Sequence, residues 1–289
     1  MSDQNPFPGE NNTGHVWDGN LRELLNDPPN WWRIGFHASW LLVVVYGILY
    51  PMWPMLNTHT KGVLGWTSIK EYKEDVKALE EIRAPFENRL KGMSAAAILA
   101  DEELKNYVVK SAKVLFGDNC AACHGNGGQG NPGFPVLADD DWLYGGKIET
   151  IEQSITMGRR GNMPARGIAG NLTDQEIDDL AKHVMALSSG GEHAPGKALF
   201  NGKGGCMACH GADGKGMQAL GAANLTDGIW RFQASDQYAS VKYTITHGVN
   251  APNDPKTRNA VMPAFGDSKL TETDIRKLAV YVHELGGGQ

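Results

Sequence analysis

The sequence predicts an all-α protein in which one membrane-spanning helix near the N-terminus precedes two tandem copies of a small helical domain. Three observations support this fold class. A long N-terminal segment lacks charged side chains, the C-terminal part repeats the same short motifs in the same order, and 289 residues with 41% apolar side chains suffice for about two domains. The formal net charge of −6 indicates no strongly basic face, so no nucleic-acid partner is expected.

The membrane-spanning helix is expected at residues 34–56. No Asp, Glu, Lys or Arg occurs between Ile34 and Thr60. At about 1.5 Å per residue a helix of this length covers roughly 35 Å, which exceeds the hydrocarbon core of about 30 Å. Pro51 and Pro54 are expected to kink or end it. A buried core helix and a cleaved signal peptide are the alternatives, but the mostly polar residues that precede the segment do not fit a signal peptide.

Two flanking regions complete the N-terminal part. Residues 1–33 are mostly polar, and residues 57–104 are expected to form a linker with a Lys- and Glu-rich helix that ends near Pro85. Lysines and arginines occur on both sides of the span with a faint excess after it, so charge alone does not fix the orientation. His37 lies inside the span, where an ionisable group suggests a function, here a hydrogen bond to a partner helix.

The remaining chain is a tandem repeat of two helical domains, residues 105–190 and residues 191–289, which join near Gly190 and Gly191. In each copy a Leu-Phe pair, a Cys-x-x-Cys-His motif, a Met-Pro-Ala string and a Leu-Thr pair follow in this order. The Leu-Thr pair opens a closing helix whose apolar side chains have the same spacing in both copies and form one helix face. These side chains are Ile177, Leu180, Ala181, Val184 and Leu187 in the first copy and Ile275, Leu278, Ala279, Val282 and Leu285 in the second.

Each closing helix also begins with a capping signal. Thr173 precedes Glu176 by three residues, and Thr271 precedes Asp274 by three. In such a pair the threonine hydroxyl and the carboxylate each accept from a backbone N–H that would lack a partner at the helix start. The sequence therefore predicts helices that start directly after Thr173 and Thr271.

The Cys-x-x-Cys-His motif, present once in each copy, is typical of covalent attachment of haem c. On a short helix the two thiols can add to the two vinyl groups of a porphyrin, while the adjacent imidazole points at the iron. The alternatives are a structural zinc site, a thioredoxin-like redox pair, or chance, but each pair is followed directly by His and a βαβ context is absent. The predicted haem-binding residues are Cys120, Cys123 and His124, and Cys206, Cys209 and His210.

The iron of each predicted haem needs a sixth ligand. Only Met163 and Met262 occur at matching places, each in a Met-Pro-Ala string shortly before the closing helix; core methionines at a turn are the alternative. The proline stiffens the loop, and a neutral thioether raises the reduction potential, as expected for electron transfer. We expect His183 and His283 to be surface or packing side chains, and His247 is a candidate donor to a haem propionate. The methionines without a counterpart are Met157, Met185, Met207 and Met217.

With these motifs the chain resembles the membrane-anchored dihaem subunit of cbb3-type cytochrome c oxidases, the CcoP or FixP type. The resemblance covers nearly the whole chain. The haem motifs with Met163 and Met262 are generic to c-type cytochromes, but their combination with particular N-terminal strings is specific. Those strings are Gly14–Asn20, Pro29–Trp32, Leu49–Pro54 and Leu64–Trp66.

The resemblance implies two tandem class I cytochrome c domains, each with one covalently bound haem c. It implies an electron-transfer subunit with no catalytic acid, base or nucleophile. Electrons would pass from a soluble or membrane-anchored donor cytochrome c to a monohaem cytochrome c subunit, and then to the haem-copper catalytic subunit of a proton-pumping oxidase that reduces oxygen to water. The expected location is the bacterial inner (cytoplasmic) membrane. Residues 1–33 would be cytoplasmic and the haem domains periplasmic, because haem c is attached outside the cytoplasm.

Two points stay open at the level of the sequence. One small domain normally encloses one haem, so each methionine is expected at the haem of its own copy, but the resemblance allows the two domains to exchange Met163 and Met262. The chemistry also fits a dihaem subunit of another membrane redox complex, such as a dehydrogenase, or a dihaem peroxidase. The N-terminal strings argue against the first, and the presence of Met in both copies argues against the second.

Overall fold

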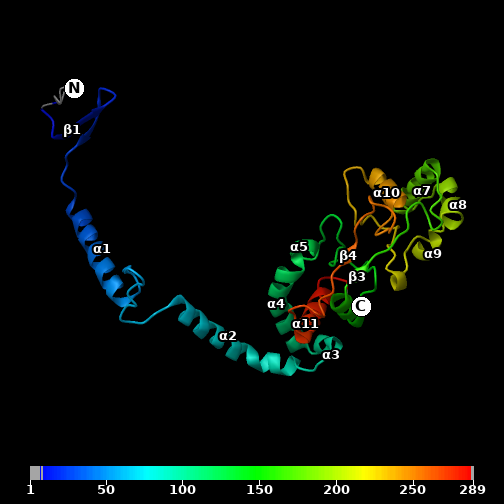
Figure 1. Ribbon diagram of the computed structural model, residues 1–289, viewed down its shortest axis with the longest axis horizontal. Coiled ribbons are helices and arrows are strands. Elements are labelled where there is room, and N and C mark those ends of the chain that lie inside the picture. Colours follow the sequence, from blue (N-terminus) through cyan, green and yellow to red (C-terminus); the bar gives the residue numbers. More distant parts are fainter. Residues whose placement is uncertain (1–6, 8, 288–289) are drawn as a thin grey trace. The chain divides into compact units, whose positions relative to one another are not determined.

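The computed structural model describes residue 7 and residues 9–287, and it is mostly helical, as predicted (Figure 1). The chain divides into two compact units, one that ends at Arg83 and one that begins at Ala84. Within the described residues, strands form two short antiparallel pairs. The predicted all-α class is therefore confirmed, with minor strands that the sequence analysis did not anticipate.

The first unit begins with one of these strand pairs. Strand β1 (Asn12–Trp17) pairs with strand β2 (Leu21–Leu24). Asp18 and Gly19 in the turn have positive φ angles of 49° and 79°, a conformation that favours the Asp-Gly dipeptide. This dipeptide is the sequence signal for the hairpin.

Helix α1 (Asn30–Leu49) is the membrane-span candidate, and among the described helices it alone is long and apolar enough to cross a membrane. It starts and ends earlier than the predicted residues 34–56. Pro29 is its N-cap, and Tyr50 adopts the extended conformation that a following proline, Pro51, favours. The expectation that proline ends the helix is confirmed, and the boundaries are corrected.

Helix α2 (Ser68–Leu90) is the predicted linker helix. It continues past its expected end near Pro85, because Phe86 and Leu90 pack into an apolar core of the second unit. Helix α3 (Ala95–Ala100) follows and belongs to the same core.

The second unit contains two apolar cores, and we call the structure around each core a module. In Figure 1, α11 lies beside α3 and α4, whereas α7 lies beside α8 and α10, in agreement with the contacts between these helices. The first module contains α3, α4 (Glu102–Asn119), α5 (Ala121–His124), α6 (Ile148–Met157) and α11 (Glu272–His283). The second contains α7 (Asp174–Leu187), α8 (Ala194–Asn201), α9 (Met207–His210), the 3-10 turn η1 (Gln218–Leu220) and α10 (Gln237–His247).

The modules do not follow the expected division at residue 190. The closing helix of each sequence copy packs in the module of the other copy: Leu180 of α7 lies in the core with Phe200, and Leu278 of α11 lies in the core with Phe116. The first module therefore comprises residues 84–160 and 261–287, and the second is the continuous stretch 161–260. The glycines near 190 connect two helices of one module and do not separate two domains.

The chain crosses between the modules at the second strand pair. Strand β3 (Arg159–Arg160) pairs with strand β4 (Val261–Met262). Gly158 and Gly248, which end α6 and α10, have φ angles of 70° and 68°. A Cβ atom at either glycine would collide with the backbone of a methionine string from the other copy. Both glycines are therefore required by their φ angle and by the close approach of the crossing strands.

Both predicted capping boxes are present. The Thr173 hydroxyl accepts from the Glu176 N–H, and the Thr271 hydroxyl accepts from the Asp274 N–H. Each carboxylate accepts in return from the threonine N–H. The predicted starts of α7 and α11 are thus confirmed.

An ion pair holds each closing helix to its module. The closing helix supplies the negative charge in the second module and the positive charge in the first. On α7 the Asp178 carboxylate lies 2.8 Å from Lys242 Nζ of α10. On α11 the Arg276 guanidinium lies 3.5 Å from a carboxylate oxygen of Glu152, on α6. Asp178 and Arg276 occupy the same place in the two copies, and so do Lys242 and Glu152. Because each closing helix packs in the module of the other copy, each of these contacts joins a positive and a negative charge.

Candidate haem sites

The first Cys-x-x-Cys-His motif lies where α4 ends and the one-turn helix α5 begins. Cys120 and Cys123 are free and half-buried. His124 is 8% exposed, and its Nδ1 donates to the carbonyl of Pro135 at 3.0 Å. This bond fixes the tautomer, so that Nε2 carries the lone pair that an iron ligand needs. Burial lowers the pKa of His124, so the imidazole is neutral at neutral pH.

The second motif repeats this geometry on α9. Cys206 and Cys209 are free and half-buried. The Nδ1 atom of His210 donates to the carbonyl of Ala223 at 2.9 Å, which again leaves Nε2 as the acceptor. Burial lowers the pKa of this imidazole as well, and it raises the pKa of the Cys206 thiol to about 11. The two motifs are thus matched in local structure and in protonation.

Each of the two predicted methionines lies in the module that contains the cysteine motif of the other copy. Met262 packs against the core of the first module, as does Cys120. Met163 packs against the core of the second module, as does Cys206. We expected each methionine to lie with the cysteine motif of its own copy. In the structure each lies with the motif of the other copy, because the methionine string and the closing helix that follows it pass together into the other module.

This set of donors fits haem c. Each module offers two free thiols, a neutral imidazole with an available Nε2, and a thioether from a different segment, which are the attachment and axial groups of a His–Met haem c. The two cysteine pairs lie in different modules and do not close one tetrahedral site, as a shared zinc ion would require. The donor chemistry therefore supports two separate haem sites.

The remaining candidate histidines have other partners. His183 is 3% exposed, accepts a hydrogen bond from the His193 N–H at 3.3 Å and meets the Phe200 ring edge-on, as a packing side chain would. The Nδ1 atom of His247 lies 2.8 Å from a carboxylate oxygen of Asp254. Of the unmatched methionines, Met185 is half-buried beside the second core, and three are exposed, namely Met157, Met207 and Met217.

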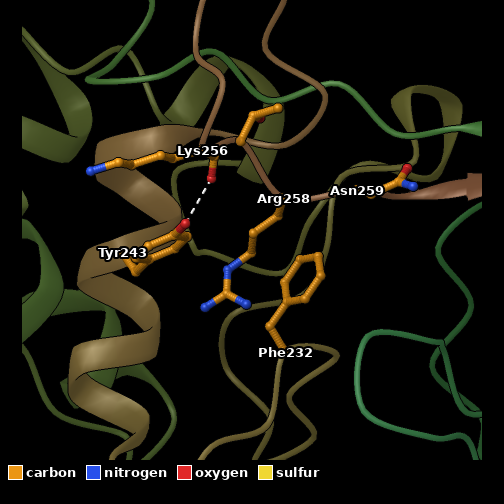
Figure 2. A pocket seen from close by; sticks show the side chains of 6 residues that line it. Phe232, Tyr243, Lys256, Arg258 and Asn259 are labelled. Carbon is orange, nitrogen blue, oxygen red and sulfur yellow. Dashed lines mark hydrogen bonds between the residues drawn. The ribbon is translucent and has the colours of Figure 1, made fainter.

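The sequence analysis missed two arginines that also occupy matching places. Arg159 and Arg258 each precede a methionine string by four residues. The Arg159 guanidinium lies 4.5 Å from the centre of the Tyr144 ring, and that of Arg258 lies 4.5 Å from the centre of the Phe232 ring. Figure 2 shows Arg258 in a cavity of about 380 Å³, between Phe232 and the α10 residue Tyr243. The shared spacing to methionine was the available sequence signal.

Comparisons with known proteins match the N-terminal region and both sequence copies. Residues 9–57 match the family described as the N-terminal domain of cytochrome oxidase-cbb3, FixP, and residues 108–184 and 191–282 match the family described as cytochrome c oxidase, cbb3-type, subunit III. The cbb3-type cytochrome c oxidase subunit FixP of Azorhizobium caulinodans is 41% identical over 97% of this chain and 94% of its own.

Two further relatives match almost from end to end. The subunit CcoP of Cereibacter sphaeroides is 38% identical over 98% of this chain and 97% of its own. The subunit FixP of Bradyrhizobium sp. strain ORS 278 is 40% identical over 100% of this chain and 99% of its own. The chain belongs to the FixP/CcoP family of cbb3-type cytochrome c oxidase subunits.

Proposed function

We propose that this chain is the dihaem electron-transfer subunit of a cbb3-type oxidase, with two covalently bound haems c. It accepts electrons from a donor cytochrome c and passes them to a monohaem cytochrome c subunit, which supplies the haem-copper subunit. The observation that carries the proposal is the pair of matched sites, each with two thiols, a fixed imidazole and a thioether. When bound, the haems supply one-electron redox chemistry at high potential.

In this proposal the residues have distinct roles. The thiols attach the haems, and His124 and His210 bind the irons through Nε2, held in one tautomer by the carbonyls of Pro135 and Ala223. Met262 completes the site of the first motif, and Met163 completes the site of the second, because each packs in that module. A dihaem peroxidase needs a displaceable ligand at one iron, and the paired methionines argue against it. The FixP-type N-terminal region favours the oxidase over a dehydrogenase complex.

Haem content tests the attachment sites. Cys206→Ala together with Cys209→Ala should leave one haem per chain in a pyridine haemochrome assay, against two in the unchanged chain. Alanine in place of the unmatched Met207 should keep two. A stoichiometry of two after removal of both thiols would contradict covalent attachment at this motif.

Electron flow tests the role of the methionines. Met163→His and Met262→His replace a thioether by a stronger donor to ferric iron, so the potential of the altered haem should fall. Oxygen consumption by the purified membrane complex with reduced cytochrome c should slow, while turnover with an artificial donor to the haem-copper centre continues. Normal potentials with full cytochrome c oxidation would exclude these residues as ligands.

The proposal also assigns an orientation to the anchor. The haem modules lie in the periplasm and residues 1–29 in the cytoplasm, because thioether attachment takes place outside the cytoplasm. Alkaline phosphatase fused after Thr60 should therefore be active. An inactive fusion there, with an active fusion near residue 10, would reverse the orientation.

A further inference from the structure

We propose that three arginines at the boundary between the modules, Arg159, Arg231 and Arg258, bind the propionate carboxylates of the two haems. The inference rests on the proposed function, since it requires a haem in each module. Within the described chain, none of the three forms an ion pair with Asp or Glu; they donate hydrogen bonds to hydroxyl, amide and carbonyl oxygens.

Arg258 has a hydrogen-bond donor without a partner. One of its terminal nitrogens donates to the hydroxyl and carbonyl oxygens of Ser240 at 2.8 and 3.2 Å, but its Nε atom is buried and unbonded. Its guanidinium lies over the rings of Phe232 and Tyr243 beside the cavity in Figure 2. A buried N–H without an acceptor is costly, so an acceptor from outside the chain is expected here.

Arg231 is a partly buried cation at the contact between the two modules. Its Nε donates to the carbonyl of Gly133 at 2.9 Å, a contact between the two modules. Burial lowers the pKa of Arg231. Gly133 belongs to the same loop as Pro135, whose carbonyl accepts from His124, so Arg231 contacts the loop that holds the proximal histidine of the first module. A partly buried guanidinium that lacks an ion-pair partner is stabilised when an anion binds to it.

Arg159 is the counterpart of Arg258 in the first module. Its Nε donates to the hydroxyl of Ser154 at 2.9 Å, and its guanidinium covers the Tyr144 ring. In the strand pair it lies opposite Met262, the methionine of the first module. Each crossing strand thus carries an arginine beside one haem site and, four residues later, the methionine of the other site.

The propionates are the anions that fit these observations. A haem attached through its vinyl groups keeps two carboxylates, and a planar guanidinium matches a carboxylate with two parallel hydrogen bonds. One anion per arginine then requires both haems to direct propionates at the module boundary. A positive charge at a propionate stabilises the reduced haem, so these contacts raise both potentials.

The test uses the full-length chain with both haems. Arg258→Gln should lower the potential of the second-module haem, and Arg159→Gln and Arg231→Gln should each lower that of the first-module haem. The Lys variant at each position should have a reduction potential close to that of the unchanged chain, because it keeps the positive charge. Arg160→Gln is the matched control: it removes an exposed charge from the same strand and should shift neither potential.

The outcomes separate the alternatives. Unchanged potentials in all three Gln variants, with a lowered melting temperature, would assign the arginines a structural role only and overturn the proposal. Shifts that vanish when phosphate is removed from the buffer would assign the anion to solvent and also overturn it. A haem count other than two in the unchanged chain would instead refute the proposed function on which the inference rests.

Discussion

The two modules contain the same parts in a different chain order. In the second module the methionine string and closing helix come first, then the cysteine motif and α10, in one continuous stretch. In the first module the cysteine motif and α6 come early, and the methionine string and closing helix arrive from the end of the chain. Similar cores therefore form from different connectivities, so proximity along the chain does not decide which closing helix joins which motif.

Charge gives a physical reason for the choice. Without the exchange, Asp178 would face Glu152, and Arg276 would face Lys242, since these positions are equivalent in the two copies. The exchange replaces two like-charge contacts by two attractive ones. An ion pair near the surface contributes only about 0.2–1 kcal/mol, but repulsion between like charges in the alternative arrangement adds to the difference.

The largest expected effect concerns ligand pairing. In a chain that keeps only the first-motif haem, through Cys206→Ala and Cys209→Ala, Met262→Ala should abolish the sulfur-to-iron absorption band near the red edge of the visible spectrum. Met163→Ala in the same chain should preserve it. The reverse result would show that each methionine serves the motif of its own copy.

Core substitutions test the exchange without reference to haem. Leu278→Ala removes a fully buried side chain from the first core, and Leu180→Ala does so in the second. Each should cost about 2–5 kcal/mol of unfolding free energy. Hydrogen exchange followed by mass spectrometry should speed up in α4 and α6 for Leu278→Ala, and in α8 and α10 for Leu180→Ala. Faster exchange in α10 after Leu278→Ala would favour unexchanged packing.

The crossing point should respond to a single methyl group. Gly248→Ala combines a positive φ angle, which costs about 1–3 kcal/mol for a residue with a side chain, with a collision against the Met163 backbone. Gly190→Ala is the control, since Gly190 has a φ angle of 73° and open space around it. Thermal unfolding should show a larger loss for Gly248→Ala. Equal losses would mean that the strands do not approach this glycine.

The smallest effect is that of a charge pair. Asp178→Lys should lower the melting temperature slightly, and Lys242→Glu in the same chain should restore part of the loss. A double variant less stable than either single variant would contradict the contact.

Acid should act on the same carboxylate. Hydrogen bonds from Lys182, Lys242 and Tyr238 hold the pKa of Asp178 well below its usual range. Its contribution is therefore complete above the unfolded value of about 4 and is lost as the pH falls below it. The stability difference between the unchanged chain and Asp178→Asn should shrink in that range. A constant difference across it would mean that the carboxylate is unpaired.

Much of this architecture was predictable because local chemistry specifies it. The capping threonines fixed where α7 and α11 begin, Pro51 ended α1, and the cysteine motifs lie on short helices as expected. The exchange was not predictable from apolar patterning, since the faces around Leu180 and Leu278 are alike and fit either core. The sequence signal was the reversal of charge between Asp178 and Arg276, which occupy equivalent positions. This signal can be used only when it is known that α7 and α11 pack against α10 and α6.

Under the proposed orientation, the discontinuous first module determines the order in which the two modules are completed. If the N-terminus stays in the cytoplasm, residues reach the periplasm in sequence order. The second module then has all its parts once residue 260 has crossed, whereas the first still lacks Met262 and α11. The motif made first is thus enclosed last, and its apolar face stays open until the final residues arrive. A chain shortened at its C-terminus loses its first site, so an intact first site reports that export has finished.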